Sequence, residues 1–138
     1  MATSQSFGMT ELRITDLMTT DLDIASSWVQ LHQAGKVPNE GNEHFWAHLF
    51  LDHLRRSDPD RCWHIILEIQ RIDSSDWVIA NLAAGPLEDL LTTFGERVID
   101  KVEKQARIDR RFREMLRLVW KNAMQDSIWD RVQRAAAV

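Results

Sequence analysis

The stretch that decides the fold is WVIANLAAGPLEDLLTTFG, from Trp77 to Gly95. In its first half, Asn81 is the one polar residue among apolar ones, and a helix that is apolar on every side must be covered by other elements. Pro86 lacks a backbone N–H and clashes with the preceding turn, so we expect a kink at Gly85-Pro86. Leucine and phenylalanine then recur at the spacing of an amphipathic helix, and Gly95 follows where a helix C-cap belongs. This pattern predicts a buried, kinked central helix with the rest of the chain packed around it.

Helical periodicity recurs along the remaining chain, and no segment alternates in the way a strand does. Capping residues, such as Asp58 followed by Pro59, predict about seven helices that begin near residues 21, 42, 59, 76, 96, 109 and 126. Short connections favour antiparallel neighbours. We therefore predict an all-α fold, a single-domain bundle or short solenoid-like stack over residues 21–138, preceded by a flexible N-terminal arm at residues 1–20.

Composition narrows the protein class. A chain of 138 residues is long enough for one apolar core without disulfides or a structural metal. The single Cys62 excludes an internal disulfide and fits a reducing cytoplasm. No apolar run is long enough to cross a membrane, and the N-terminus lacks the features of a secretory signal. We expect a cytoplasmic protein that uses no cofactor.

Charge is distributed unevenly. Residues 1–60 hold nine acids against four bases, whereas residues 96–138 hold seven acids against eleven bases. The basic residues on the expected outer faces of the later helices are Arg97, Lys101, Lys104, Arg110, Arg113, Arg117 and Lys121. Basic stripes bind phosphates in nucleic-acid-binding proteins. Here acids interrupt the stripes and no glycine-rich loop accompanies them, so an intramolecular or solvated charged face is favoured over nucleic-acid binding.

Histidines on the second expected helix raise the question of a metal site. His44 and His48 are four residues apart, with Asp52 one turn further on. This spacing places three metal-ligand types on one helix face. No cysteine or second histidine pair completes a four-ligand set, so we interpret the stripe as solvated or partner-facing and leave metal binding open.

Two polar features of the central helix have structural interpretations. Glu88 and Asp89 invite comparison with the paired carboxylates of acid–base catalysis, but they lie where acids meet the positive end of a helix. Adjacent residues also point about 100° apart, so they would not converge on one substrate. Asn81 is expected to be a buried amide that donates to the carbonyl left unpaired by Pro86, and a ligand-binding amide is the alternative.

The candidate binding surface lies on the second expected helix. Leu51 falls on its outer side among imidazoles and charged groups, and an apolar centre with a charged rim suits a basic protein partner. The predicted partner-binding residues are Glu40, Glu43, His44, His48, Leu51, Asp52 and Arg55. The alternative is that another helix of this protein, or a second subunit in a homo-oligomer, covers Leu51.

One segment of the chain also resembles a known family. The run ANLAAGPLEDLL, from Ala80 to Leu91, is followed by Gly95, Ile99-Asp100, Phe112-Arg113 and Val119-Trp120. With these residues the chain resembles an uncharacterised family of small bacterial helical domains, over residues 24–132. The resemblance implies a bacterial origin and an all-helical fold, and it supplies no catalytic residues.

The sequence contains no phosphate-binding loop, catalytic triad or metal-ligand framework. It therefore favours a protein-binding domain that is not an enzyme, of the immunity or antitoxin type, acting by steric binding of another protein. One alternative is an enzyme whose site is built from scattered Asp, Glu and His residues. Another is a nucleic-acid or regulatory adaptor that uses the basic C-terminal helices.

Overall fold

The computed structural model describes residues 19–33 and 39–137, and these residues follow the helical pattern of the sequence. The elements are α2 (Asp21–His32), α3 (Phe45–Ser57), α4 (Pro59–Ile72), α5 (Asp76–Leu82), the π-helix η2 (Ala83–Leu87), α6 (Glu88–Ile108), α7 (Arg110–Leu116) and α8 (Asp126–Ala137). No strand occurs within the described ranges, so the all-α prediction is confirmed. Most of the predicted N-terminal arm lies outside the described residues. No described helix has the length and apolar content that a membrane span requires.

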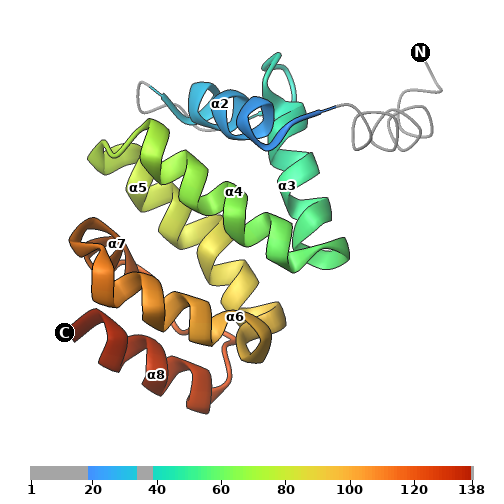
Figure 1. The fold of residues 1–138 in the computed structure, drawn as a ribbon. Coiled ribbons are helices and arrows are strands. Elements are labelled where there is room, and N and C mark those ends of the chain that lie inside the picture. The colour runs from blue at the N-terminus through green and yellow to red at the C-terminus, as the bar shows by residue number, and fades with distance from the viewer. Residues whose placement is uncertain (1–18, 34–38, 138) are drawn as a thin grey trace.

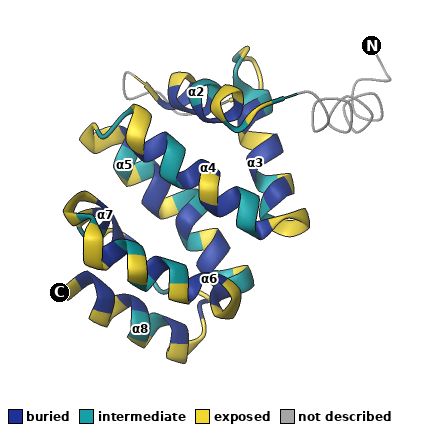
Figure 2. Ribbon diagram, viewed as in Figure 1, coloured by how far each residue is buried: buried dark blue, intermediate teal, exposed yellow. Residues whose placement is uncertain are grey.

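The helices stack in layers that follow the order of the chain (Figure 1). α2 packs on α3 and α4, α4 packs against α6, and both α6 and α7 pack against α8. Buried positions on each helix face the neighbouring layer, and exposed positions face outward (Figure 2). The largest fully buried side chains include Trp28, Phe50 and Phe112. Each helix thus buries its apolar stripe against the next layer.

Local caps define helix starts. The carboxylate of Asp58 accepts a backbone N–H in the first turn of α4, and Pro59 occupies the first helical position as predicted. The start of α3 differs from the prediction. The Asn42 side chain accepts the N–H of His44 within a turn (2.8 Å), so the helix begins only at Phe45.

The central helix does not kink at the predicted place. α5, η2 and α6 form one continuous helical segment, in which residues 83–87 widen into a π-turn around Pro86. The N–H of Glu88 donates to the carbonyl of Ala83, five residues earlier, so the helix continues past a residue that cannot donate. The non-helical backbone lies further on, at Phe94 (φ −133°, ψ 40°). The described residues therefore form six helical segments rather than about seven, and the central one is kinked at Phe94.

Gly95 is a contact point between helices and not a C-cap. A Cβ atom built on Gly95 would lie 2.8 Å from Cγ1 and 2.9 Å from Cγ2 of Ile128, which is buried on α8. The missing side chain lets α8 approach the backbone of α6 directly. A glycine at this position is therefore explained by packing.

The first half of the central helix is not covered on every side, so that expectation is wrong. Val78 and Leu82 are buried, but Trp77 is 43% exposed, and Ala80 and Ala84 are also exposed. α2 and α4 pack against α5 and leave this face open. An apolar sequence shows what a helix can bury, and neighbouring elements decide how much of it is buried.

Ion pairs connect consecutive layers. Asp60, in the first turn of α4, accepts hydrogen bonds from Arg97 (2.9 Å) and Lys101 (3.1 Å) of α6. These two cations lower the pKa of the Asp60 carboxyl to about 2. On the other side of α6, Arg131 of α8 forms a two-pronged pair with Glu103 (2.6 and 2.9 Å). The middle layer is thus linked electrostatically to both neighbours.

The contact at Gly95 predicts a difference between two glycine substitutions. Gly95→Ala should lower the free energy of unfolding by about 1–3 kcal/mol, because the β-branched Ile128 cannot move away without shifting α8. Gly85→Ala should be neutral or stabilising by up to about 1 kcal/mol, because its Cβ would meet nothing within 4 Å and alanine favours a helix. Denaturant unfolding of both variants measures this difference. Equal stability of the two would contradict the proposed packing.

The Asp60 ion pairs predict a pH-dependent contribution to stability. Because the pKa is lowered from 3.8 to about 2, the carboxylate stabilises the fold above pH 3.8, and this contribution is lost as the pH falls towards 2. Asp60→Asn should therefore be less stable than the wild type at pH 7, and the difference should shrink in acid. Urea unfolding at a series of pH values tests this. Glu96→Gln, at an exposed position of α6, is the control and should show no such trend.

Candidate functional site

α3 does not present Leu51 to solvent. Leu51 is 2% exposed and belongs to the core, and the exposed leucine of this helix is Leu49, at 47%. α2, α4 and η2 all pack against α3, so the buried side of the helix is wider than a single stripe. The prediction that Leu51 is the apolar centre of an interface is therefore wrong. Its alternative, that another part of this protein covers Leu51, is correct.

A small pocket of about 50 Å³ lies where α3 meets the π-turn. Its α3 side is formed by four of the predicted partner-binding residues, His48, Leu51, Asp52 and Arg55. Its other residues are Cys62, Gly85, Pro86 and Asp89. The polar stripe of α3 and the GPLED segment of the central helix, which are separate features of the sequence, are therefore parts of one site.

An ion-pair network occupies the α3 side of the pocket. Asp52 Oδ1 accepts from Nη2 (2.8 Å) and Nε (3.3 Å) of Arg55, and Asp52 Oδ2 lies 3.1 Å from Nη2 of Arg56. Arg55 Nη1 also donates to the hydroxyl of Thr93 on α6 (2.7 Å). Burial opposes ionisation of Asp52, but the hydrogen bonds and charges of the two arginines outweigh it and lower the pKa of the carboxyl. Asp52 is thus a carboxylate with its counter-ions already in place.

Asp89, on the α6 side of the pocket, has no such partner. Its carboxyl forms no hydrogen bond or ion pair with any residue that the structure describes. Asp89 is accessible to solvent. Partial burial of its carboxyl nevertheless raises the pKa of this group, although the positive charge of Arg55 acts in the opposite direction. The neighbouring Glu88 instead accepts hydrogen bonds from the Trp120 N–H (3.2 Å) and the Asn122 amide (2.6 Å). The two adjacent carboxylates therefore diverge and have different surroundings.

The remaining pocket residues are apolar or lack a side chain. Cys62 is fully buried, and burial raises the pKa of its thiol to about 12, so it is not a nucleophile at neutral pH. Gly85 borders open space, because a Cβ atom built there would have no neighbour within 4 Å. The pocket therefore combines an apolar wall with charged groups at its edge.

The other predicted partner-binding residues lie at the start of α3. Glu40 and Glu43 are exposed, and His44 Nε2 lies 3.5 Å from a carboxylate oxygen of Glu43. Within the described ranges, no three His, Cys, Asp or Glu side chains are arranged to hold a metal ion. The helical spacing of His44, His48 and Asp52 does not produce such a group.

Asn81 does not fill its predicted role. It is half-buried, and its Nδ2 donates to the carbonyl of Trp77, one turn earlier in the same helix (2.8 Å). The predicted acceptor, a carbonyl left unpaired by Pro86, is therefore wrong. A side chain bonded to its own helix adds little to tertiary stability.

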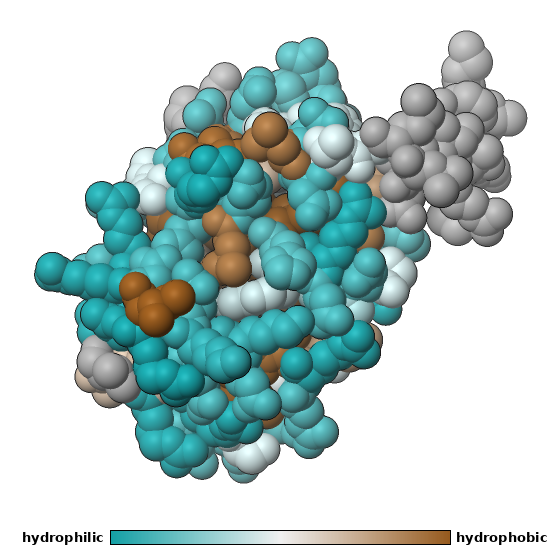
Figure 3. Space-filling model, viewed as in Figure 1, coloured by the Kyte–Doolittle hydropathy of each residue, from teal (hydrophilic) through white to brown (hydrophobic). Residues whose placement is uncertain are grey.

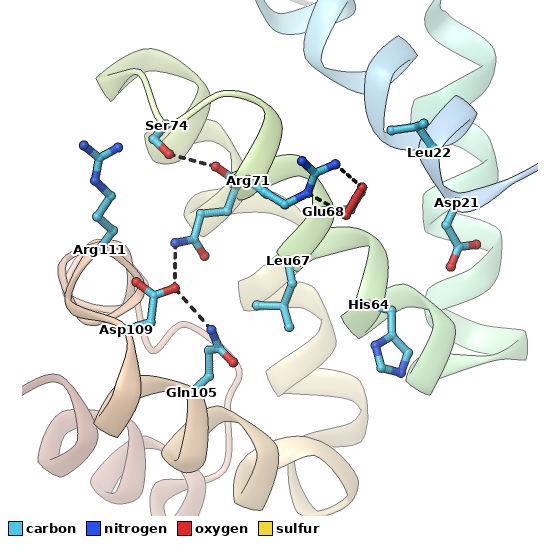
Figure 4. A pocket seen from close by; sticks show the side chains of 11 residues that line it. Asp21, Leu22, His64, Leu67, Glu68, Arg71, Ser74, Gln105, Asp109 and Arg111 are labelled. Carbon is cyan, nitrogen blue, oxygen red and sulfur yellow. Dashed lines mark hydrogen bonds and ion pairs between the residues drawn. The ribbon is translucent and has the colours of Figure 1, made fainter.

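A wider groove of about 770 Å³ lies over the outward side of α4. This face of the molecule is mostly hydrophilic, with apolar atoms in scattered patches across its middle (Figure 3). Asp109 Oδ2 accepts from the Gln70 and Gln105 amides (both 3.1 Å), and Glu68 pairs with Arg71 (2.5 Å) (Figure 4). The Gln70–Asp109 bond joins α4 to the start of α7, whereas the Glu68–Arg71 pair lies within α4.

Several basic side chains of the C-terminal helices bind within the protein. Arg113 and Arg117 donate to backbone carbonyls of α6 and α8 (2.6 and 3.0 Å), and Lys121 pairs with Asp126 (3.0 Å). Arg97 and Lys101 are bound to α4, as described above. These contacts support the intramolecular interpretation of the basic faces.

Comparison with known families gives one match. The model of a family of unknown function, DUF6869, covers residues 34–138. The chain belongs to this family. The match confirms the resemblance to an uncharacterised family, and it includes every residue of the pocket but not α2. None of the curated proteins and none of the solved structures matches the chain.

The two leucines of α3 provide a matched pair for testing this geometry. Leu51→Ala should lower the free energy of unfolding by about 2–5 kcal/mol, because it removes buried methyl groups and leaves a cavity beside the pocket. Leu49→Ala should change it by less than about 0.5 kcal/mol, because the side chain is half in solvent. Chemical denaturation measures both. A larger loss of stability for Leu49→Ala than for Leu51→Ala would show that α3 is rotated relative to this structure.

Proposed function

We propose that this chain is a protein-binding domain that contacts a basic partner protein through its α3 face. The α3 face consists of the accessible residues of α3 and the preceding turn: Glu40, Glu43, His48, Leu49, Asp52 and Arg56. The pocket described above lies at the edge of this face and shares His48 and Asp52 with it.

Uncompensated negative charge is the observation that carries the proposal. Arg55 and Arg56 both form their ion pairs with Asp52, so within the described residues neither makes a direct ion pair with another carboxylate of this surface. Glu40 and Glu43 are exposed at one end of the α3 face, and the unpaired Asp89 lies beside it. Carboxylates arranged in this way accelerate association with a basic protein and favour it over an acidic one.

Leu49 supplies the apolar element that such an interface needs. It is 47% exposed and lies between His48 and Asp52 along the outer side of α3. A single exposed leucine is common on protein surfaces. An apolar side chain within a charged rim nevertheless has the arrangement of a binding surface, in which the centre is buried on association and the rim stays hydrated.

The size of the pocket favours binding over catalysis. Sites for small-molecule substrates usually enclose about 300–1,000 Å³, and this pocket encloses about 50 Å³. One observation favours an enzyme as the second candidate. The pKa of Asp52 is lowered and that of Asp89 is raised in the same pocket. Enzymes that use two carboxyl groups as acid and base separate their pKa values in this way.

Within this proposal the domain acts as a steric inhibitor of the immunity or antitoxin type, which covers the surface of its target. Its small size and its acidic face support this role. A cytoplasmic location in a bacterium is part of the same proposal, supported by the resemblance and by a single buried cysteine.

Capture of the partner tests the proposal. The full chain is immobilised and exposed to a lysate of the organism that makes it, next to Leu49→Asp and Leu118→Asp. Leu118 is a matched control because it is 44% exposed and lies after α7, away from the α3 face. We expect a basic protein to be captured by the wild type and by Leu118→Asp and to be lost with Leu49→Asp, with all three equally stable to heat.

Two results would contradict this expectation. Loss of the captured protein with Leu118→Asp alone would place the interface elsewhere. Turnover of a small molecule that depends on both Asp52 and Asp89, without any captured protein, would favour the enzyme.

A further inference from the structure

The pocket beside the α3 face holds one carboxylate, that of Asp89, which forms no hydrogen bond or ion pair within the described residues. Three of the five N–H groups of Arg55 are bound, one each of Nε and Nη2 to Asp52 and one of Nη1 to Thr93. Both oxygens of Asp52 are likewise occupied by arginines. Asp89 alone among the charged residues of the pocket has a carboxylate with no hydrogen-bond donor from the described chain. Asp89 is therefore open to direct contact with a cation from outside the chain.

We propose that the pocket binds the ammonium end of a lysine side chain from the partner protein, with Asp89 as its counter-ion. This inference rests on the proposed function, because it names the group that the basic partner inserts at the edge of the α3 face. The bound lysine would complete the site in the way that Arg55 completes Asp52.

The shape of the pocket fits lysine better than arginine. A volume of about 50 Å³ admits only a few heavy atoms. An ammonium is a compact charge, whereas a guanidinium is broad and pairs best with both oxygens of a carboxylate in one plane. Leu51, Cys62 and Pro86 provide an apolar wall for the methylene stem of lysine.

The presence of a glycine at position 85 is explained if a group from the partner protein fills the pocket. Glycine weakens a helix relative to alanine, so a glycine within a helical segment needs a reason. No neighbouring atom of this chain supplies one, because a Cβ at Gly85 would meet nothing within 4 Å. Gly85 nevertheless lines the pocket, and the space where its Cβ would stand is open. The missing side chain therefore leaves space for a bound group.

The electrostatics of Asp89 agree with this arrangement. Desolvation raises the pKa of its carboxyl, and Glu88 and Asp52 add to the effect, while Arg55 and His48 oppose it. An ionised Asp89 is thus under-compensated in the free protein, and a cation in contact with it supplies the missing stabilisation. Asp89 gains more from a partner cation than a fully hydrated surface carboxylate does.

Butylammonium, which reproduces the end of a lysine side chain, is the direct probe. It is titrated into the full-length protein at constant ionic strength, and binding is followed by backbone amide NMR. We expect saturable shifts at Gly85 and Asp89 with a dissociation constant on the order of 1–10 mM, as befits so few ligand atoms. Neither 1-pentanol, which lacks the charge, nor propylguanidinium should bind as tightly as butylammonium. Equal binding of propylguanidinium, or no saturable shift with butylammonium, would overturn the proposal.

Three variants locate the bound amine. Asp89→Asn should weaken butylammonium binding at least tenfold, and Gly85→Ala should weaken it by placing a methyl group at the open edge of the pocket. Ala84→Ser is the control, because this exposed neighbour of Gly85 does not line the pocket, and it should bind like the wild type. Unchanged binding by both Asp89→Asn and Gly85→Ala would overturn the assignment. The proposed function fails separately, because capture of a basic protein that depends on Leu49 can persist when the amine does not bind.

Discussion

The structure depends on how one helix accommodates a proline. Pro86 has no N–H to donate to the carbonyl of Leu82, one turn earlier. The helix widens there into a π-turn, in which the N–H of Glu88 donates to the carbonyl of Ala83, so the chain passes the proline without ending the helix. This adjustment keeps α5 and α6 in one continuous segment, against which α4 and α8 pack from different sides. It also brings Gly85 and Asp89 alongside α3. The candidate pocket is thus a consequence of the same local change that preserves the helix.

Much of the fold could be predicted because helix formation is governed by near neighbours. The Asp58-Pro59 start of α4 needs no information from elsewhere in the chain. The burial of Leu51 and the exposure of Leu49 do need such information, because they depend on η2, which comes much later in the sequence. The open face at Trp77 has the same cause, since no local signal tells whether a neighbouring element covers it.

The candidate site could be predicted only in part. Helical spacing placed His48, Asp52 and Arg55 on one side of α3, and they do line the pocket. No local pattern joins them to Asp89, which shares a helix turn with Glu88 but faces different surroundings. The angle between adjacent helical residues predicts that the two carboxylates diverge. Only the packing of α3 against the π-turn shows which of them meets the arginine network.

The position of α2 has a consequence for the family as a whole. The family match begins at residue 34, yet α2 precedes it and buries Ile24, Trp28 and Leu31 almost completely. These side chains cover apolar surface on α3 and α4. A fragment cut at the family boundary would expose that surface to water and tend to self-associate. The segment that the family model matches is therefore smaller than the unit that folds in this protein, and any relative that lacked a counterpart of α2 would need another cover for the same surface.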